Sequence, residues 1–247
     1  MSPAAQIWIA GAVGLCIGSY AATAVLRWTQ GRPSSWGRSS CDHCGIALGF
    51  ARTAPVLSFV WQRGACSACG GRIDPLHLSG EVAGAVILGS AFAVAPFSRA
   101  LLLSVLGSAL LIAVLCDAKV RRLPDRLTAL IALAGAALSA LRSWETLALG
   151  AACAAATFVV LEGVRRGFLL YKGKPGLGGG DVKLLAAMAI WVGSHTPWVI
   201  AAASLLGLMA TVIRRSPDGR LAFGPYMAVA AWGIGIAGEA GLWPIPT

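Results

Sequence analysis

The sequence predicts an all-α integral membrane protein with about eight transmembrane helices and a small extramembrane domain between the first two. Three observations lead to this fold class: an apolar composition, recurring charge-free runs, and one long polar segment near the N-terminus. Of the 247 residues, 57% are hydrophobic and only 12% are charged. A soluble domain with a mixed surface has a far more polar balance, so lipid is the expected solvent of most of the chain.

Charge-free runs suited to membrane spans recur along the whole chain. They cover residues 5–26, 82–98, 100–116, 127–141, 146–161, 184–213 and 221–238. Several approach the length of roughly 20 residues that crosses a bilayer as a helix. The run at 184–213 is too long for one crossing and contains a turn-like cluster from Gly193 to Pro197, so it is interpreted as two short spans. This division gives eight spans.

The positions of the basic residues predict how these spans are oriented. Only Arg99 and Arg142, out of 20 Lys and Arg residues, fall in alternate connections; the others lie in segments 27–79, 119–126, 165–183 and 214–220. Because connections rich in Lys and Arg stay in the cytoplasm, these four segments are expected to be cytoplasmic and both termini outside. The net charge of +10 then reflects topology and contact with anionic membrane lipid, and no nucleic acid is expected as a partner.

The first run could be a cleaved signal peptide or a retained membrane anchor. No basic segment precedes it, and its first positive charge, Arg27, lies on its C-terminal side. This order favours a retained first helix that enters with its N-terminus outside.

The polar segment from residue 27 to 79 contains two Cys-x-x-Cys pairs, CDHC at 41–44 and CSAC at 66–69. Paired thiolates at this spacing are typical of a tetrahedral zinc site, and the reducing cytoplasm argues against disulfides. We expect a structural Zn²⁺ because so small a segment has little apolar mass for a core of its own. Redox chemistry and a substitute ligand in His43 remain open. The expected ligands are Cys41, Cys44, Cys66 and Cys69, with knuckle turns at Gly45 and Gly70.

Two of the ten acidic residues, Asp117 and Asp181, lie at boundaries of apolar runs that the topology places at the cytoplasmic face. A carboxylate at this depth is costly unless it is paired or used in chemistry. If the two carboxyl groups approach each other they share a proton, so one can activate a water while the other polarises a scissile carbonyl. This is the chemistry of an aspartic peptidase. The alternative is simple ion pairing with Lys119, Arg121 or Lys183.

The residues around these two carboxylates suggest distinct roles. Glycines 178, 179 and 180 directly precede Asp181 and would let backbone or an extended substrate approach it closely. The surrounding stretch 172–180, which includes Pro175, is expected to form a loop. Asp125 follows Pro124 at the start of an apolar run and is interpreted as an N-terminal helix cap.

Taken together, these residues resemble the type IV prepilin peptidase family of intramembrane aspartic peptidases. One family motif corresponds to Asp117 with Leu123, Pro124 and Asp125, and the other to the run GGGDVK at 178–183. The resemblance implies Asp117 and Asp181 as the catalytic pair, with Gly178, Gly180 and Lys183 in a supporting loop. Further landmarks at family spacing are Gly18, Ser19, Tyr20, Arg27, Pro55, Leu57, Ser58, Ile73, Glu81 and the stretch Phe223–Tyr226.

The resemblance implies an enzyme of the bacterial inner membrane that removes the short basic leader of type IV prepilins or pseudopilins after a glycine. Many members then methylate the new N-terminus with S-adenosyl-L-methionine, using the cytoplasmic portion. Departures from the usual family residues occur in that portion, at 52–54 and 76–78. Glu81 stays open between a role in methylation and a helix cap.

The implied domain division is a first transmembrane helix at 1–26, a cytoplasmic zinc-binding domain at 27–79 and a seven-helix peptidase core at 80–247. Two functions of other classes compete with this interpretation. One is a proton- or cation-coupled transporter with a zinc-binding cytoplasmic gate, in which Asp117 and Asp181 carry the ions. The other is a zinc-dependent membrane scaffold without catalysis.

Overall fold

The computed structural model describes residues 2–33, 37–173, 176–214 and 222–242. Within these ranges the regular elements are helices, accompanied by two isolated β-bridges. The chain divides into two compact units, residues 1–93 and 94–247. We call them unit 1 and unit 2 and describe each by itself. The predicted division into domains at residues 26 and 79 stays a prediction.

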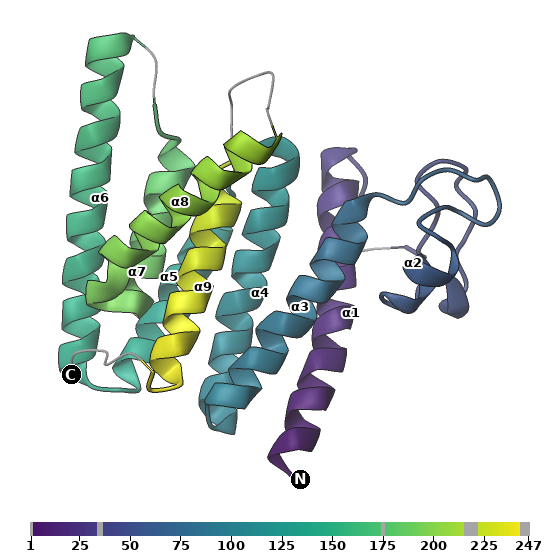
Figure 1. Cartoon of the computed structure of the whole chain (residues 1–247), viewed down its shortest axis with the longest axis horizontal. Helices are drawn as coiled ribbons and strands as arrows, with labels where there is room; N and C mark the ends of the chain where they lie inside the picture. Colours follow the sequence, from purple (N-terminus) through teal and green to yellow (C-terminus); the bar gives the residue numbers. More distant parts are fainter. Residues whose placement is uncertain (1, 34–36, 174–175, 215–221, 243–247) are drawn as a thin grey trace. The chain divides into compact units, whose positions relative to one another are not determined.

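Unit 1 consists of two long helices joined by a cysteine-rich stretch, residues 30–74, which we call the cysteine segment (Figure 1). The long helices are α1 (Pro3–Thr29) and α3 (Pro75–Val94), and the segment holds η1 (Phe50–Arg52) and α2 (Leu57–Trp61). The helix α1 begins with Pro3, after a Ser2 hydroxyl that accepts the Ala5 N–H at 3.3 Å. Proline suits this position because the first N–H groups of a helix have no partner within it.

Glycines set the approach of α1 and α3 within unit 1. A Cβ atom on Gly18 would lie 2.0 Å from the carbonyl oxygen of Gly80, and one on Gly14 would lie 2.2 Å from that of Gly84. Both helices therefore bring their backbones together where side chains are absent. Such contacts between small residues are a common basis of helix association in membranes.

The described residues of unit 2 form a bundle of six helices (Figure 1), among which α7 buries a large share of its residues. The helix α7 packs against α5, α6 and α9 and buries a large part of its side chains, among them Met188 and Trp191. The elements are α4 (Phe97–Val120), α5 (Asp125–Ala140), α6 (Trp144–Lys172), α7 (Gly179–Val192), η2 (Gly193–His195), α8 (Thr196–Arg214) and α9 (Gly224–Glu239).

The predicted all-α membrane fold is confirmed, with the cysteine segment between the first two long helices. Each of the eight expected spans coincides with one long helix of the described residues. Five helical segments are long and apolar enough to cross a membrane: Pro3–Thr29, Pro75–Val94, Phe97–Val120, Trp144–Lys172 and Gly179–Ile213. The helices α5 and α9 have 16 residues each, which is shorter than a full crossing normally needs.

The long run at 184–213 divides where the sequence predicts. Gly193 ends α7 with φ +57, a conformation that suits glycine, and the short helix η2 leads into α8. Figure 1 shows α8 turning back from the end of α7. The expected loop at 172–180 is shorter than predicted, because Gly179 and Gly180 already belong to α7. Pro175, part of that expectation, lies outside the described residues.

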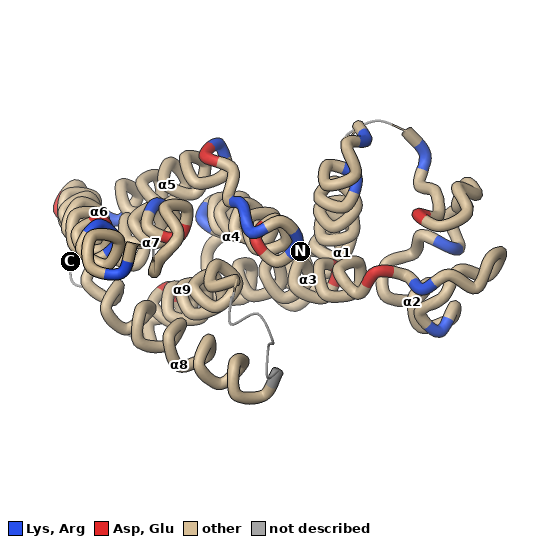
Figure 2. Tube along the Cα trace, turned by 90° about the horizontal axis from the view of Figure 1, so that it is seen from above, with Lys and Arg blue, Asp and Glu red and all other residues tan. Residues whose placement is uncertain are grey.

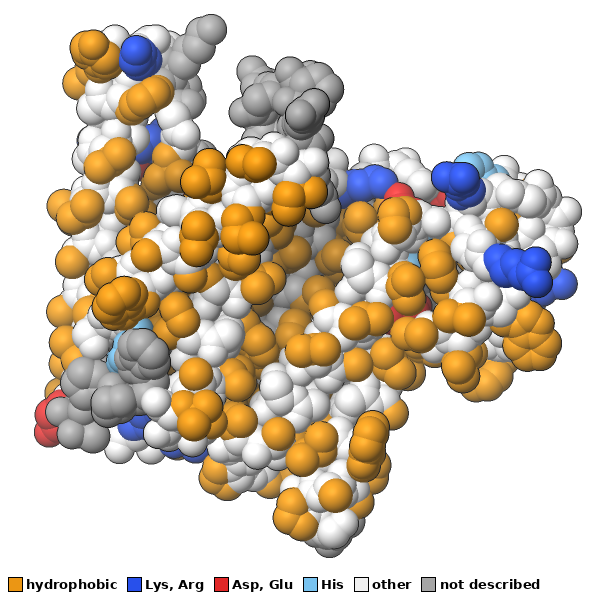
Figure 3. Space-filling model, viewed as in Figure 1, with side chains coloured by type: hydrophobic (Ala, Val, Ile, Leu, Met, Phe, Trp, Pro, Cys, Tyr) orange, Lys and Arg blue, Asp and Glu red, His pale blue; other side chains and the backbone are white. Residues whose placement is uncertain are grey.

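Charged and apolar side chains separate along unit 2. Figure 2 shows Lys and Arg residues where α4 ends and where α5 and α7 begin. By contrast, Figure 3 shows the outer face of α8 covered by apolar side chains. The exposed apolar residues of α8 include Leu205, Leu208, Met209, Val212 and Ile213. An apolar belt of this kind is what a helix facing lipid requires.

The glycine contact in unit 1 gives a first prediction. The substitution Gly18→Ala places a methyl group against the Gly80 carbonyl, so α1 and α3 must separate. Overpacking of this kind costs about 1–3 kcal/mol, and we expect a lower thermal unfolding temperature in detergent micelles. Gly89→Ala in α3 is the matched control, because its added Cβ meets no atom within 4 Å. Equal unfolding temperatures for the two variants would contradict the close packing.

Candidate functional site

Asp117 lies three residues before the end of α4 and is only 6% exposed. Its Oδ2 atom accepts the backbone N–H of Gly224, the first residue of α9, at 3.0 Å. The first N–H groups of a helix have no partner within it and favour negative charge, so the start of α9 suits a carboxylate. A Cβ on Gly224 would lie 2.7 Å from Oδ2, so only glycine permits this contact.

Asp181 lies in the first turn of α7 and is partly buried. Two of the three preceding glycines have a steric reason to be there. A Cβ on Gly178 would lie 2.9 Å from Asp181 Oδ2, and one on Gly180 would lie 3.2 Å from the side chain of Leu123. The glycines therefore let the backbone before α7 pass close to the carboxyl group and to the chain that follows α4.

The structure brings Asp117 and Asp181 near enough for their charges to interact. They come from different helices, α4 and α7, and both of these helices pack against α5 and α9. Neither carboxylate forms a direct ion pair in the part of the chain that the structure describes. No direct ion pair therefore joins either acid to Lys119, Arg121 or Lys183 among the described residues, although the charge of Arg121 still acts on Asp117.

Asp125 has a different environment from the one the sequence predicts. The N-cap of α5 is Pro124, and the helix itself begins with Asp125. The Asp125 side chain makes no capping hydrogen bond, so the predicted cap is wrong. Its Oδ1 atom instead accepts Lys183 Nζ of α7 at 2.7 Å. Both side chains are largely exposed, which limits such a pair to about 1 kcal/mol at most. Lys183 therefore links α7 to α5 beside Asp181.

The four predicted cysteines come together in unit 1. The sulfur atoms of Cys41, Cys44, Cys66 and Cys69 all lie within 4.8 Å of one another, and Cys41 and Cys69 are 3.9 Å apart. Tetrahedral zinc with Zn–S bonds of about 2.3 Å separates its sulfurs by roughly 3.8 Å, so the four thiols match the size of such a site. This arrangement is compatible with a structural zinc ion.

The two Cys-x-x-Cys pairs form equivalent turns. The N–H of Cys41 bonds to the carbonyl of Ile46 and that of Cys66 to Gly71, at 3.0 and 2.8 Å. The expected turns at Gly45 and Gly70 have φ +72 and +71, a region that favours glycine. His43 Nε2 donates a hydrogen bond to the Arg72 carbonyl at 3.1 Å, and His43 is not part of the sulfur cluster.

The thiols of this cluster differ in acidity. Backbone N–H groups of Ala68 and Cys69 lower the pKa of Cys66 to about 6. At Cys69 the Gly71 N–H acts in the same direction, but the neighbouring thiols, Cys44 first, raise the pKa to about 11. Four thiolates this close repel one another, and a bound cation would remove that repulsion.

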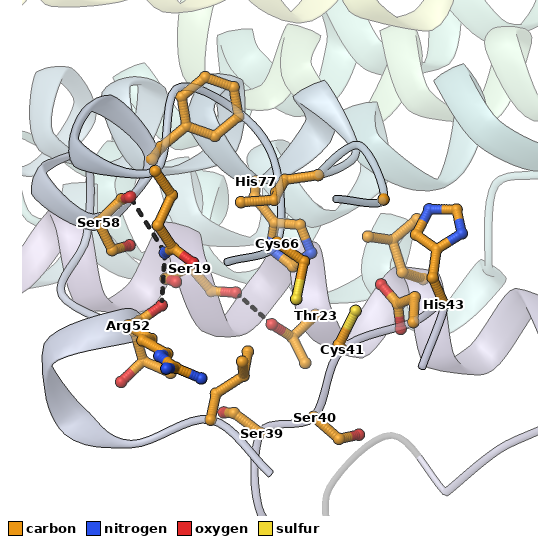
Figure 4. Close-up of a pocket in the computed structure, with 18 of the residues that line it drawn as sticks. Ser19, Thr23, Ser39, Ser40, Cys41, His43, Arg52, Ser58, Cys66 and His77 are labelled. Carbon is orange, nitrogen blue, oxygen red and sulfur yellow. Dashed lines mark hydrogen bonds between the residues drawn. The ribbon is translucent and has the colours of Figure 1, made fainter. Parts of the chain in front are cut away.

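A polar pocket in unit 1 lies between α1, the cysteine segment and α3 (Figure 4). Its wall includes Glu81, which is 5% exposed and lies within α3, so Glu81 is not a helix cap. The carboxylate accepts the Ser19 hydroxyl and the Val56 N–H, each at 2.7 Å. Val56 has φ +60, which is rare for a β-branched residue, so Glu81 holds a strained piece of backbone. The sequence left both partners unidentified.

Comparison with known proteins gives consistent results along the chain. The family described as "Type IV leader peptidase family" matches residues 104–212, and the "Bacterial Peptidase A24 N-terminal domain" matches 12–95. A prepilin leader peptidase/N-methyltransferase of Dickeya chrysanthemi is 31% identical over 91% of both chains. One from Aeromonas hydrophila is 31% identical, covering 79% of this chain and 70% of that protein. One from Neisseria gonorrhoeae is 30% identical, covering 82% and 72%. No solved structure matches.

Proposed function

The chain belongs to the type IV leader peptidase family, and from this membership we propose that it is a membrane-embedded aspartic endopeptidase with Asp117 and Asp181 as its catalytic pair. Its substrates are type IV prepilins or pseudopilins, from which it removes a short basic leader. The proposal extends to this chain what the names of the similar proteins state of them.

The observation that carries the proposal is that the charges of two carboxyl groups, one on α4 and one on α7, act on each other, while one of them, Asp117, also accepts the first N–H of α9. Two carboxyl groups that interact closely hold one proton between them. The charged member takes a proton from the attacking water, and the protonated member donates a hydrogen bond to the scissile carbonyl. The Gly224 N–H fixes the direction of Asp117 Oδ2 and so leaves Oδ1 for water or substrate.

The location of the pair agrees with cleavage at the cytoplasmic face of the bacterial inner membrane. Asp117 and Asp181 lie at the helix ends that the basic connections assign to the cytoplasm. In this orientation the N-terminus faces outside, and the zinc-binding segment shares the cytoplasmic side with the active site. The apolar helix of the prepilin stays in the membrane while its leader is removed.

The transporter alternative has no support among the relatives, whose printed names describe enzymes. The same names speak against a scaffold without catalysis. The triple glycine before Asp181 also fits an extended peptide substrate, which needs close approach of backbone to backbone.

The catalytic pair gives a second prediction. Asp117→Asn and Asp181→Asn each remove an ionisable group with little change of shape, and we expect leader cleavage to fall by about 10³-fold or more. The measurement is the cleavage rate of a synthetic prepilin, a short basic leader ending in glycine joined to an apolar helix, in proteoliposomes. Asp125→Asn is the matched control at the same end of the bundle. Because Asp125 forms only an exposed ion pair, we expect the cleavage rate of this control to change by about fivefold at most. Normal cleavage by either pair variant would refute the assignment.

A structural Zn²⁺ held by Cys41, Cys44, Cys66 and Cys69 belongs to the same proposal. The sulfur spacing fits the ion, and when bound it cross-links the two turns of a segment that has few buried apolar residues. The cysteine segment then keeps its shape without taking part in peptide cleavage.

The zinc site gives a third prediction. Cys41→Ser and Cys66→Ser should each reduce the zinc bound per protein, measured by elemental mass spectrometry, and lower the unfolding temperature, because three thiolates leave the shell incomplete. Cys153→Ser, in α6 and outside the cluster, is the control that should keep its zinc. Full zinc content in the first two variants would exclude this ligand set.

Methylation of the new N-terminus is a second candidate activity, and the pocket around Glu81 favours it. In the described residues this buried carboxylate has hydrogen-bond donors but no ion pair, so it suits a cationic group. S-adenosyl-L-methionine supplies a methyl group on a positively charged sulfur when bound. Glu81 would face that charge or the amino group of the pilin. Among the residues where this chain departs from the family, Arg52, Thr53 and His77 line the same pocket.

The pocket gives a fourth prediction. Mass spectrometry of a cleaved synthetic prepilin should find one methyl group on its new N-terminus when S-adenosyl-L-methionine is present. Glu81→Gln removes the negative charge, so we expect at least about tenfold less methylation while cleavage continues at its usual rate. An unmethylated product from the unchanged protein would mean that the protein has peptidase activity only. Equal methylation by Glu81→Gln and by the unchanged protein would exclude Glu81 from the methylation site.

A further inference from the structure

A buried ion cluster joins several helices of unit 2. The side chain of Glu239, the last residue of α9, is 3% exposed. Its carboxylate accepts hydrogen bonds from Arg99 at 2.8 Å, from Arg142 at 2.5 Å and from Trp191 Nε1 at 3.1 Å. We call these four residues the Glu239 cluster.

Three members of the Glu239 cluster lie on helices that also supply the proposed active site. Arg99 lies in the first turn of α4, which carries Asp117 18 residues later, or roughly 27 Å along a helix. Trp191 nears the end of α7, which carries Asp181 in its first turn. Glu239 ends α9, whose first residue donates its N–H to Asp117. The same three helices therefore meet at both locations (Figure 1).

Trp191 makes the packing of α7 against α9 rigid beside the Glu239 cluster. It is 1% exposed, its ring centroid lies 5.7 Å from that of Trp232 on α9, and its ring leaves no room for a side chain at Gly235. A Cβ on Gly235 of α9 would lie 2.2 Å from the indole ring, and one on Gly135 of α5 would lie 3.3 Å from the Trp191 Cβ. Direct packing of an indole on backbone opposes sliding of α7 against α9.

The charges of the Glu239 cluster require its members to stay close together. Two guanidinium groups share one carboxylate, and Arg99 Nε and Arg142 Nη1 are buried without a hydrogen-bond partner in the described residues. Buried cations are costly when their counter-charge moves away, so α4 and the α5–α6 turn are held to the end of α9. These are also the two arginines that stand apart from the otherwise cytoplasmic distribution of basic residues. Their pairing with Glu239 accounts for that exception.

We infer that Glu239 is a positioning residue for the catalytic pair: it fixes how α4, α7 and α9 lie along one another, and thereby where Asp117, Asp181 and the Gly224 N–H meet. The inference rests on the proposed function. A small axial shift of α9 would move the Gly224 N–H away from Asp117 without changing any residue of the active site. Misplacement by about 1 Å is enough to slow an enzyme by about 10²-fold.

The test compares Glu239→Asp and Glu239→Gln with the unchanged protein in the same prepilin cleavage assay, with kcat and KM measured separately. The aspartate variant keeps the charge but is shorter by one methylene group, so the cluster closes only if α9 moves. We expect kcat to fall about 10- to 100-fold in both variants with KM nearly unchanged. Glu162→Gln is the matched control, because Glu162 also binds two arginines, Arg165 and Arg166, but within α6 alone. Its kcat should match that of the unchanged protein.

A third variant, Gly235→Ala, displaces α9 from Trp191 without altering any charge. It should lower kcat in the same way and remains informative if the Glu239 variants accumulate poorly. Folded variants at Glu239 and Gly235 with normal kcat would overturn the inference, as would a rise in KM alone. Asp117→Asn, measured in parallel, distinguishes a failure of the proposed catalytic pair from a failure of the positioning role of Glu239. If that variant cleaves normally, the catalytic pair is wrong and the positioning role falls with it; if it is inactive, the result at Glu239 stands on its own.

Discussion

A carboxylate inside an apolar helix bundle depends on partners that the protein itself supplies, because lipid and apolar side chains offer none. Three carboxylates in this chain meet that requirement in different ways. Asp117 accepts the free N–H at the start of α9, Glu81 accepts a hydroxyl and a strained backbone N–H, and Glu239 binds two arginines and an indole. Each pairing joins parts of one unit that are far apart in sequence, so satisfying these groups also fixes the arrangement of the helices.

The features that the sequence predicts well are those that depend on local composition. Among the described residues, the eight spans expected from seven apolar runs each coincide with a helix, and the break at Gly193 appears where turn-forming residues interrupt a run. The cysteine pairs meet because each closes a turn by itself and only one other pair is available. The glycines before Asp181 also signal close packing correctly, since two of them face atoms that a Cβ would strike.

The features that the sequence misses are the partners of polar groups across the fold. Asp125 has the local signature of a helix cap, yet Lys183 lies within its reach once α5 and α7 pack together. Glu81 lies inside α3 because that helix already begins at Pro75, six residues before Glu81. Nothing near Glu239 in sequence indicates that Arg99 and Arg142 will meet it. Such ion pairs depend on which helices are neighbours in the fold. No local pattern in a single sequence indicates which helices will be neighbours.

The two units supply separate carboxylates for the two proposed chemistries, and this separation has a consequence for how the sequence can vary. The residues that the resemblance marks as departures from the usual family residues, at 52–54 and 76–78, all belong to unit 1, where three of them line the Glu81 pocket. The contacts that hold Asp117, through Gly224 and through the Glu239 cluster at the far ends of α4 and α9, come entirely from unit 2. A change in the pocket wall therefore removes none of these contacts. Under the proposed assignments, substitutions in the pocket wall act first on methylation, whereas a change in the register of α9 acts first on cleavage.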